Sequence, residues 1–168
     1  MQLTSFTDFG LRALMRLAGD PERTFSTDDI AREFDISRNH LIKVVRKLAA
    51  TGFVTTQRGS GGGFRLARPS ETITIGEIVR ALEARYPLVE CFRSDGGSCA
   101  LLPSCRLKAR LAAAREAFFA ELDQSTLAQC AYRIPSISGT GPEPEQVDAL
   151  AKSRERSYTK PLAAPPKP

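Results

Sequence analysis

The stretch STDDIAREFDISRNHLIKVVRKLAATGFVTTQRGSGGGFRLAR, residues 26–68, decides the fold of this chain. It contains two helix starts: Ser26 is a favourable N-cap with Asp29 at the capping-box position, and Ser37 is a second N-cap. Apolar residues recur at helical spacing after each cap. The residues expected to face inward are Ile30, Ala31 and Phe34 in the first helix and Leu41, Val44, Val45 and Leu48 in the second. Two short capped helices joined by a tight turn predict a helix-turn-helix.

A β-hairpin is expected directly after these helices. The segments Phe53–Arg58 and Phe64–Ala67 are rich in strand-forming residues and flank a glycine-rich tip, Gly59–Gly63. The tip resembles a phosphate-binding loop, but it lacks the Gly-Lys-Ser/Thr ending and joins two strands instead of a strand and a helix. The arrangement predicts a winged helix-turn-helix.

The charge distribution indicates the partner of this domain. The chain has a net charge of +5, and residues 37–68 contain no acidic residue. The basic residues of this stretch are Arg38, Lys43, Arg46, Lys47, Arg58, Arg65 and Arg68. Because an ordinary solvated surface intersperses acids, this stretch predicts a face that binds a polyanion, and double-stranded DNA is the expected partner.

The candidate DNA contacts fall into two sets. The start of a recognition helix enters the major groove, where Arg suits guanine and Asn suits adenine. Arginines near a glycine-rich tip suit a narrow minor groove. The expected recognition-helix contacts are Ser37, Arg38, Asn39, His40 and Lys43, with Arg46 and Lys47 on phosphates. The expected wing contacts are Arg58, Gly61, Gly62 and Arg65. His40, the single histidine, is assigned to DNA and not to a metal.

Three further helices are expected around this domain. The first has an apolar stripe from Phe6 to Leu17, with Asp8, Arg12 and Arg16 on its polar side. Another starts at Thr74, where Glu77 completes a capping box and Ile75, Ile78, Val79 and Leu82 face inward.

The third is a long helix over Arg106–Asp123, with a stripe formed by Leu107, Leu111, Ala114, Phe118 and Leu122. One winged-helix core offers little to cover this stripe, so a partner subunit is expected to do so. The fold class is therefore mainly α with a small β-hairpin.

The expected organisation has four parts: a DNA-binding domain at 1–85, a cysteine-bearing loop at 86–105, a dimerisation helix and a short following helix at 106–135, and a mostly disordered tail at 136–168. The tail is rich in proline, with a brief helix near 144–155. No apolar run is long enough to span a membrane, and the first residues lack a secretory-signal pattern. A cytoplasmic location is expected.

Cysteines mark the second candidate site. Cys91, Cys99 and Cys105 lie within one glycine-containing segment, and soft thiolates select zinc, copper(I) or iron–sulfur clusters. Zinc sites usually pair cysteines two to four residues apart, whereas a cluster tolerates wider spacing. Cys130 follows in a short apolar segment and is expected to be a buried structural thiol. A thiol oxidoreductase or zinc hydrolase would need a paired thiol or a convergent acid/base constellation, whereas the single histidine lies in the DNA-facing helix, so enzymatic activity is not expected.

Six segments together resemble the Rrf-type winged-helix transcriptional regulators, and among them the nitric-oxide-sensing NsrR group. They are LTSFTDFGLRALMRLA at 3–18, ISRNHLIKVVRKLAATGFV at 36–54, RGSGGGFRLARP at 58–69, IGEIVRALE at 75–83, LVECF at 88–92 and CRLK at 105–108. The resemblance covers residues 1–130 in unbroken order.

The resemblance implies a homodimeric repressor of palindromic operator DNA whose three cysteines Cys91, Cys99 and Cys105 hold a 4Fe–4S cluster. It further implies that nitric oxide attacks the cluster and that the repressor then leaves its operator. A sister group that regulates cluster assembly has a histidine ligand where this chain has Lys108. The alternative is a winged-helix regulator that senses iron–sulfur status or redox state through a 2Fe–2S cluster.

The fourth iron ligand is the remaining question. From the residues alone, Asp8 is an ordinary acid in the first turn of a helix, four residues before Arg12. By resemblance, Asp8 matches a position from which an aspartate ligates the cluster of the opposite subunit. We therefore expect Asp8 of one protomer to ligate the cluster of its partner.

Overall fold

The computed structural model describes residues 2–59, 61–101 and 104–133, all within one compact unit, Met1–Ile134. Its helices are α1 (Ser5–Ala18), α2 (Thr27–Glu33), α3 (Arg38–Ala50), α4 (Ile75–Glu83) and α5 (Arg106–Asp123), with β1 (Val54–Gln57) and β2 (Gly63–Leu66) between α3 and α4. Short 3-10 turns lie at Ser70–Thr72, Glu90–Phe92 and Ala128–Cys130. The expected winged-helix fold is confirmed. The expectations for the tail at 136–168 lie outside the described residues.

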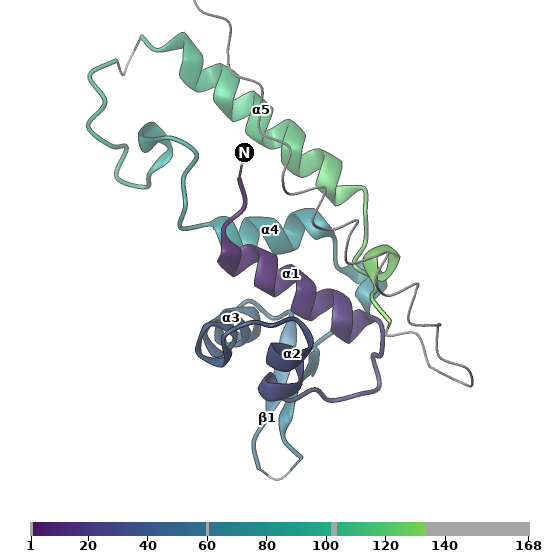
Figure 1. Ribbon diagram of the computed structural model, residues 1–168. Coiled ribbons are helices and arrows are strands. Elements are labelled where there is room, and N and C mark those ends of the chain that lie inside the picture. Colours follow the sequence, from purple (N-terminus) through teal and green to yellow (C-terminus); the bar gives the residue numbers. More distant parts are fainter. Residues whose placement is uncertain (1, 60, 102–103, 134–168) are drawn as a thin grey trace, which may run out of the picture. The chain divides into compact units, whose positions relative to one another are not determined.

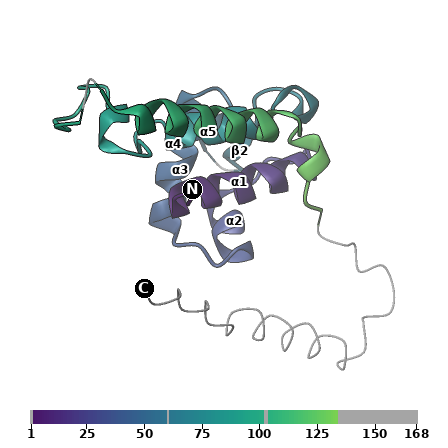
Figure 2. The same ribbon diagram turned by 90° about the horizontal axis from the view of Figure 1, so that it is seen from above.

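The helices pack in an order that differs from their order in the chain. Helix α4 contacts α5 and α1, and α1 in turn packs on α3, which contacts α2 and β1 (Figures 1 and 2). The core lies mainly among α1, α2, α3, the hairpin and α4. Its largest fully buried side chains are Phe25, Phe53, Phe64, Leu14, Leu17, Ile30, Leu41, Leu48, Ile73, Ile78, Leu127 and Val44. The inward residues expected from helical spacing are therefore largely confirmed, although Phe34 and Ile75 are only half-buried.

The N-caps of α2 and α3 differ from each other. The Asp29 N–H donates to Ser26 Oγ over 3.1 Å and the Ser26 N–H donates to Asp29 Oδ2 over 3.2 Å, so the expected capping box is present. Ser37 occupies the N-cap position of α3 but makes no side-chain capping bond. The expected N-cap position is therefore confirmed, while the capping bond is absent; the backbone ψ is 124° at Ser37 and 157° at Ser26.

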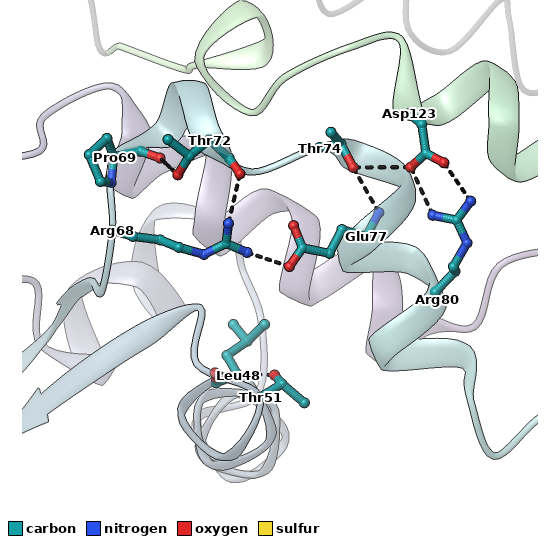
Figure 3. Close-up of polar contacts among 9 residues, drawn as sticks. All are labelled: Leu48, Thr51, Arg68, Pro69, Thr72, Thr74, Glu77, Arg80 and Asp123. Carbon is teal, nitrogen blue, oxygen red and sulfur yellow. Dashed lines mark hydrogen bonds and ion pairs between the residues drawn. The ribbon is translucent and has the colours of Figure 1, made fainter.

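Two residues of α4, Glu77 and Arg80, form ion pairs with residues outside this helix (Figure 3). The Glu77 N–H donates to Thr74 Oγ1 over 3.1 Å, which is half of the expected capping box. The other half is absent because the Glu77 carboxylate pairs with Arg68, the residue that follows the wing. On the far side, Asp123 at the end of α5 accepts from Thr74 Oγ1 at 3.0 Å and from Arg80 Nη1 at 2.8 Å. Helix α4 is thus tied both to the wing and to α5.

A segment outside the hairpin also pairs with the wing, which the sequence pattern did not indicate. Strands β1 and β2 are antiparallel, with Val54 opposite Leu66. Phe25, between α1 and α2, forms an isolated bridge with Phe64: its N–H donates to the Phe64 carbonyl over 3.0 Å and the reverse bond is 2.8 Å. The hairpin is therefore paired along β2 with the segment that precedes the helix-turn-helix, which fixes its position on that domain.

The segment after α5 returns to the body of the unit. The Leu127 N–H donates to the Ile73 carbonyl, and the Tyr132 N–H donates to the Met15 carbonyl, both over 2.8 Å. A Cβ at position 19 would lie 1.9 Å from the Tyr132 carbonyl oxygen, so this close approach requires Gly19. These bonds connect the residues after α5 to α1 and to the segment just before α4.

Candidate nucleic-acid interface and cysteine loop

The exposed face of α3 carries the residues expected to contact DNA. Helical periodicity places Leu41, Val44, Val45 and Leu48 in the core, so the intervening polar residues are directed to solvent. The exposed members of the predicted set on this helix and its N-cap are Ser37, Arg38, Asn39, His40, Lys43 and Arg46. Lys47, by contrast, is half-buried.

The wing presents the second predicted set. Arg58 is exposed directly after β1, and Arg65 is exposed on β2 opposite Thr55. Gly61 has a φ of +76°, a conformation that side chains rarely adopt, and a Cβ at Gly62 would lie 2.5 Å from the Gln57 carbonyl oxygen. The glycines of the tip are therefore required by its tight backbone, in addition to any close approach to a duplex.

The basic stretch 37–68 contains no acidic residue, but acidic side chains from other helices contact it. Asp28 on α2 forms an ion pair with Arg38 at the start of α3, and Glu77 on α4 pairs with Arg68. Sequence reasoning missed Asp28 as a neighbour of the recognition helix. The spacing of ten residues across a helix-turn-helix was the only available indication, because the turn brings the start of α3 back to the start of α2.

The three candidate cluster ligands lie in the segment between α4 and α5. Cys91 is in the 3-10 turn Glu90–Phe92, Cys99 follows it, and Cys105 is the N-cap residue of α5. All three are free thiols and half-buried. Within the residues that the structure describes, no three His, Cys, Asp or Glu side chains lie close enough together to hold a metal ion. The donor chemistry fits a cluster, whereas this loop conformation does not gather the thiols.

The acids of the loop are engaged with the loop itself. The Ser98 N–H and hydroxyl each donate to Glu90 Oε1 over 3.0 Å, and these bonds, the backbone one first, hold the pKa of Glu90 below its ordinary value. Asp95 accepts from Gly97 N at 3.0 Å and from Arg93 at 2.7 Å. In this conformation both carboxylates therefore stabilise the turn.

An open pocket adjoins the loop. Its volume is about 890 Å³, and it is bounded by α4, the first part of the loop and α5. Phe92, Arg93 and Asp95 line it from the loop, facing Arg115 and Phe119 of α5.

Asp8 lies on α1, away from these thiols in sequence. Its carboxylate pairs with Arg12 Nη2 at 2.8 Å, and its side chain is 45% exposed. The ordinary role expected from the residues alone, an i,i+4 pair in the first turn, is thus present in the single chain. Its expected role toward a partner subunit stays a prediction.

Two sequence expectations about individual residues were wrong. Cys130, expected to be buried, is half-buried at the end of a single 3-10 turn, where only the preceding Leu127 is fully enclosed. Arg16, expected on the polar side of α1, is buried: its Nε donates to Glu33 Oε2 over 3.1 Å, and its guanidinium lies 4.5 Å from the centre of the Phe25 ring. The ion pair with Glu33 of α2 and the contact with the Phe25 ring enclose this part of the polar side of α1.

The apolar stripe of α5 is only partly covered in the described part of the chain, and its expected contact with a partner subunit stays a prediction. Phe119 is the only buried residue among the described residues of α5, and it packs toward α4. Leu107 is 62% exposed, and Leu111, Phe118 and Leu122 are half-buried.

No helix in the described part of the chain is long and apolar enough to cross a membrane.

Comparison with known proteins identifies the family. The model of the Rrf2 family, described as iron-dependent transcriptional regulators, matches residues 3–133. Among solved structures, the oxidised form of Staphylococcus aureus CymR is 26% identical, with 81% of this chain and 100% of that chain covered and a TM-score of 0.60. CymR of B. subtilis, described as the global cysteine regulator, is 28% identical over 78% of this chain and 96% of that chain, with a TM-score of 0.62. IscR of T. potens is 25% identical over 77% of this chain and 85% of that chain, with a TM-score of 0.59. The chain therefore belongs to the Rrf2 family, whose members are transcriptional regulators and not enzymes.

Proposed function

We propose that this regulator is a cytoplasmic homodimeric repressor that binds palindromic operator DNA and is released when nitric oxide reacts with an iron–sulfur cluster. The observation that carries the proposal is the combination of an exposed basic recognition helix with three free thiols in one loop of the same compact unit. The resemblance of the motifs to the NsrR group supplies the signal, and the family supplies the regulatory class.

Cys91, Cys99 and Cys105 would hold the cluster, which supplies a centre that reacts with nitric oxide. The left-handed backbone of Gly96 (φ +77°) and Gly97 (φ +62°) makes the intervening turn compact. Because the thiols are not gathered in the present conformation, holding a cluster would require the loop to close around it. Cys105 would bring one thiolate to the N-terminus of α5, where the helix dipole favours negative charge.

Helix α1 is the element that would transmit the state of the loop to the recognition helix. At its N-terminus, the Thr4 N–H and hydroxyl both donate to Glu83 Oε1 at 2.8 Å, at the end of α4 just before the loop. Near its C-terminus, the buried Arg16–Glu33 pair joins α1 to α2. A displacement at the loop end of α1 would therefore move the helix-turn-helix as a body.

The alternative is a 2Fe–2S regulator that senses iron–sulfur status or redox state. Lys108, in the first turn of α5, cannot serve as the neutral nitrogen ligand that the sister group uses there, which disfavours the ligand set of that group without excluding a 2Fe–2S cluster. Protein purified anaerobically should be brown, and native mass spectrometry or Mössbauer spectroscopy then gives the number of irons. A 2Fe–2S mass would select the alternative, whereas colourless protein with stoichiometric zinc would overturn both.

Operator release is tested separately by titrating nitric oxide into the complex of cluster-loaded protein with DNA selected from a random duplex library. We expect the complex to dissociate as the cluster spectrum changes. A complex that survives complete loss of the cluster spectrum would contradict the proposed signal but not the DNA-binding role.

Binding to DNA should depend steeply on salt, and the residues of α3 should divide by role. Lys47→Ala is expected to weaken binding to selected and to random duplexes equally. It should also lower the slope of log affinity against log salt concentration by about 0.9 per lost phosphate contact, hence by about two per dimer. Asn39→Ala should also relax base preference, because it lies in the groove-facing first turn. Fluorescence anisotropy at several salt concentrations measures both. Equal losses on both kinds of duplex for Asn39→Ala would contradict this division.

Asp8 is proposed as the fourth ligand, donated to the cluster of the partner subunit. A hard carboxylate is a weak ligand for cluster iron, so it is suited to being released first. Asp8→Ala should keep a cluster on three thiolates, change its spectrum and weaken DNA binding, whereas Asp8→Cys should keep a fourth ligand. Arg12→Ala is the matched control, because it removes the ion pair of Asp8 but leaves the carboxylate. An unchanged spectrum and DNA affinity in Asp8→Ala would leave Asp8 with its role on α1 alone.

A further inference from the structure

An exposed ion pair joins the two helices of the helix-turn-helix at the point expected to face DNA. Arg38 is the first residue of α3, and Asp28 lies in the first turn of α2. Arg38 Nε donates to Asp28 Oδ1 over 2.5 Å. The two side chains are 60% and 55% exposed. An ion pair this exposed contributes only about 0–1 kcal/mol to stability, and the place of Asp28 in the first turn of α2 contributes a similar amount through the helix dipole. Neither contribution requires the carboxylate to bind the arginine at the start of the recognition helix.

The geometry of the pair leaves a specific part of the guanidinium available. The bond to Asp28 uses Nε, and in the described part of the chain neither Nη group of Arg38 makes a hydrogen bond. Guanine offers two acceptors, O6 and N7, to a pair of N–H groups in the major groove. An arginine side chain loses about 2 kcal/mol of rotamer entropy when it becomes fixed. Arg38 held in advance by Asp28 would lose less of it on binding.

The negative charge of Asp28 also affects whether Arg38 binds a base edge or a DNA phosphate. A free arginine binds a phosphate as readily as a base edge, and phosphate contacts carry no sequence information. A carboxylate bound to the same guanidinium repels a phosphate that approaches it, whereas guanine O6 and N7 carry no net charge. The pair therefore favours base contact over backbone contact.

We propose that Asp28 is a specificity-determining residue that positions Arg38 for guanine and disfavours its binding to phosphate. The inference rests on the proposed DNA-binding role of α3 and adds to it a residue of α2 that is not itself basic. Asp28 acts through Arg38, so its effect on base preference must vanish when Arg38 is absent.

The test is selection from a random duplex library by the full chain, followed by sequencing of the bound DNA. The variants are Asp28→Asn, Asp28→Ala, Arg38→Ala and Asp28→Asn combined with Arg38→Ala. Glu22→Gln removes the same charge from an exposed position in the turn before α2 and is the matched control. The capping box of Ser26 and Asp29 stays intact in every variant, and thermal melts verify the fold.

Arg38→Ala identifies the guanine position that depends on this arginine. At that position we expect Asp28→Asn and Asp28→Ala to lower the preference for guanine by about 3- to 10-fold, a part of what a bidentate pair provides. Affinity for random duplex should rise by up to about fivefold for each protomer that contacts the duplex, the effect of one unit of repulsion removed near a phosphate. Glu22→Gln should retain the guanine preference, and adding Asp28→Asn to Arg38→Ala should change no base preference.

The outcomes separate this inference from the proposed function. If the unaltered chain selects no sequence, both are overturned. If Arg38→Ala relaxes a guanine position but Asp28→Asn and Asp28→Ala do not, the proposed function stands and the role of Asp28 is overturned. If Asp28→Asn alters base preference equally with and without Arg38, Asp28 contacts DNA directly and the positioning role is also overturned.

Discussion

Replacing Cys91, Cys99 or Cys105 with alanine is expected to leave the protein unable to retain a cluster after anaerobic reconstitution. Each change removes one of three thiolates that come from a single loop, and two thiolates with one carboxylate bind cluster iron weakly. Bound iron and the visible absorption spectrum measure the loss, which should be nearly complete for each variant. Nitric oxide should then have no effect on DNA binding.

Cys130→Ala is the matched control for this set. Cys130 is also half-buried and free, but it lies after α5, next to Leu127, and not in the loop. We expect Cys130→Ala to retain the cluster and its spectrum. Because none of the four thiols is in the core, circular dichroism of every variant should match the unaltered protein. A colourless Cys130→Ala protein, or a Cys99→Ala protein with full iron content, would contradict the ligand assignment.

The second large effect is expected at the buried ion pair between α1 and α2. Arg16→Ala should lower the free energy of unfolding by about 3 kcal/mol, the low end of the cost of removing one partner of a buried pair. The Arg16 side chain is 5% exposed and Glu33 19%, so the carboxylate would remain largely enclosed without its cation. The contact of the guanidinium with the Phe25 ring would be lost as well.

Urea unfolding of the cluster-free protein measures this difference. Arg12→Ala, on the same helix, removes an arginine from an ion pair that is 47% and 45% exposed, and it should change the free energy of unfolding by less than about 1 kcal/mol. Glu33→Ala combined with Arg16→Ala should cost less than the sum of the single changes, since no unpaired charge remains. Equal effects of Arg12→Ala and Arg16→Ala would show that burial does not control the stability of this pair.

Local structure followed from local pattern. The bounds of α5, Arg106–Asp123, agree with those expected from periodicity, and Ser26 and Asp29 form the capping box that their spacing indicates. The hairpin lies where strand formers flank glycine. The capping box and the hairpin turn each depend on residues that are close together in the chain. Both interacting partners are therefore visible in a short stretch of sequence.

The sequence by itself determined the winged-helix class, the exposed basic face of α3 and the common segment of the three cysteines. Only the tertiary structure decided that Arg16 is buried, that Phe25 pairs with Phe64 and that Asp28 binds Arg38. These contacts join different elements, and they depend on how the helices pack and not on any local preference. Periodicity identifies which side of a helix is apolar, but a neighbouring helix decides which polar residues at its margin lose contact with water.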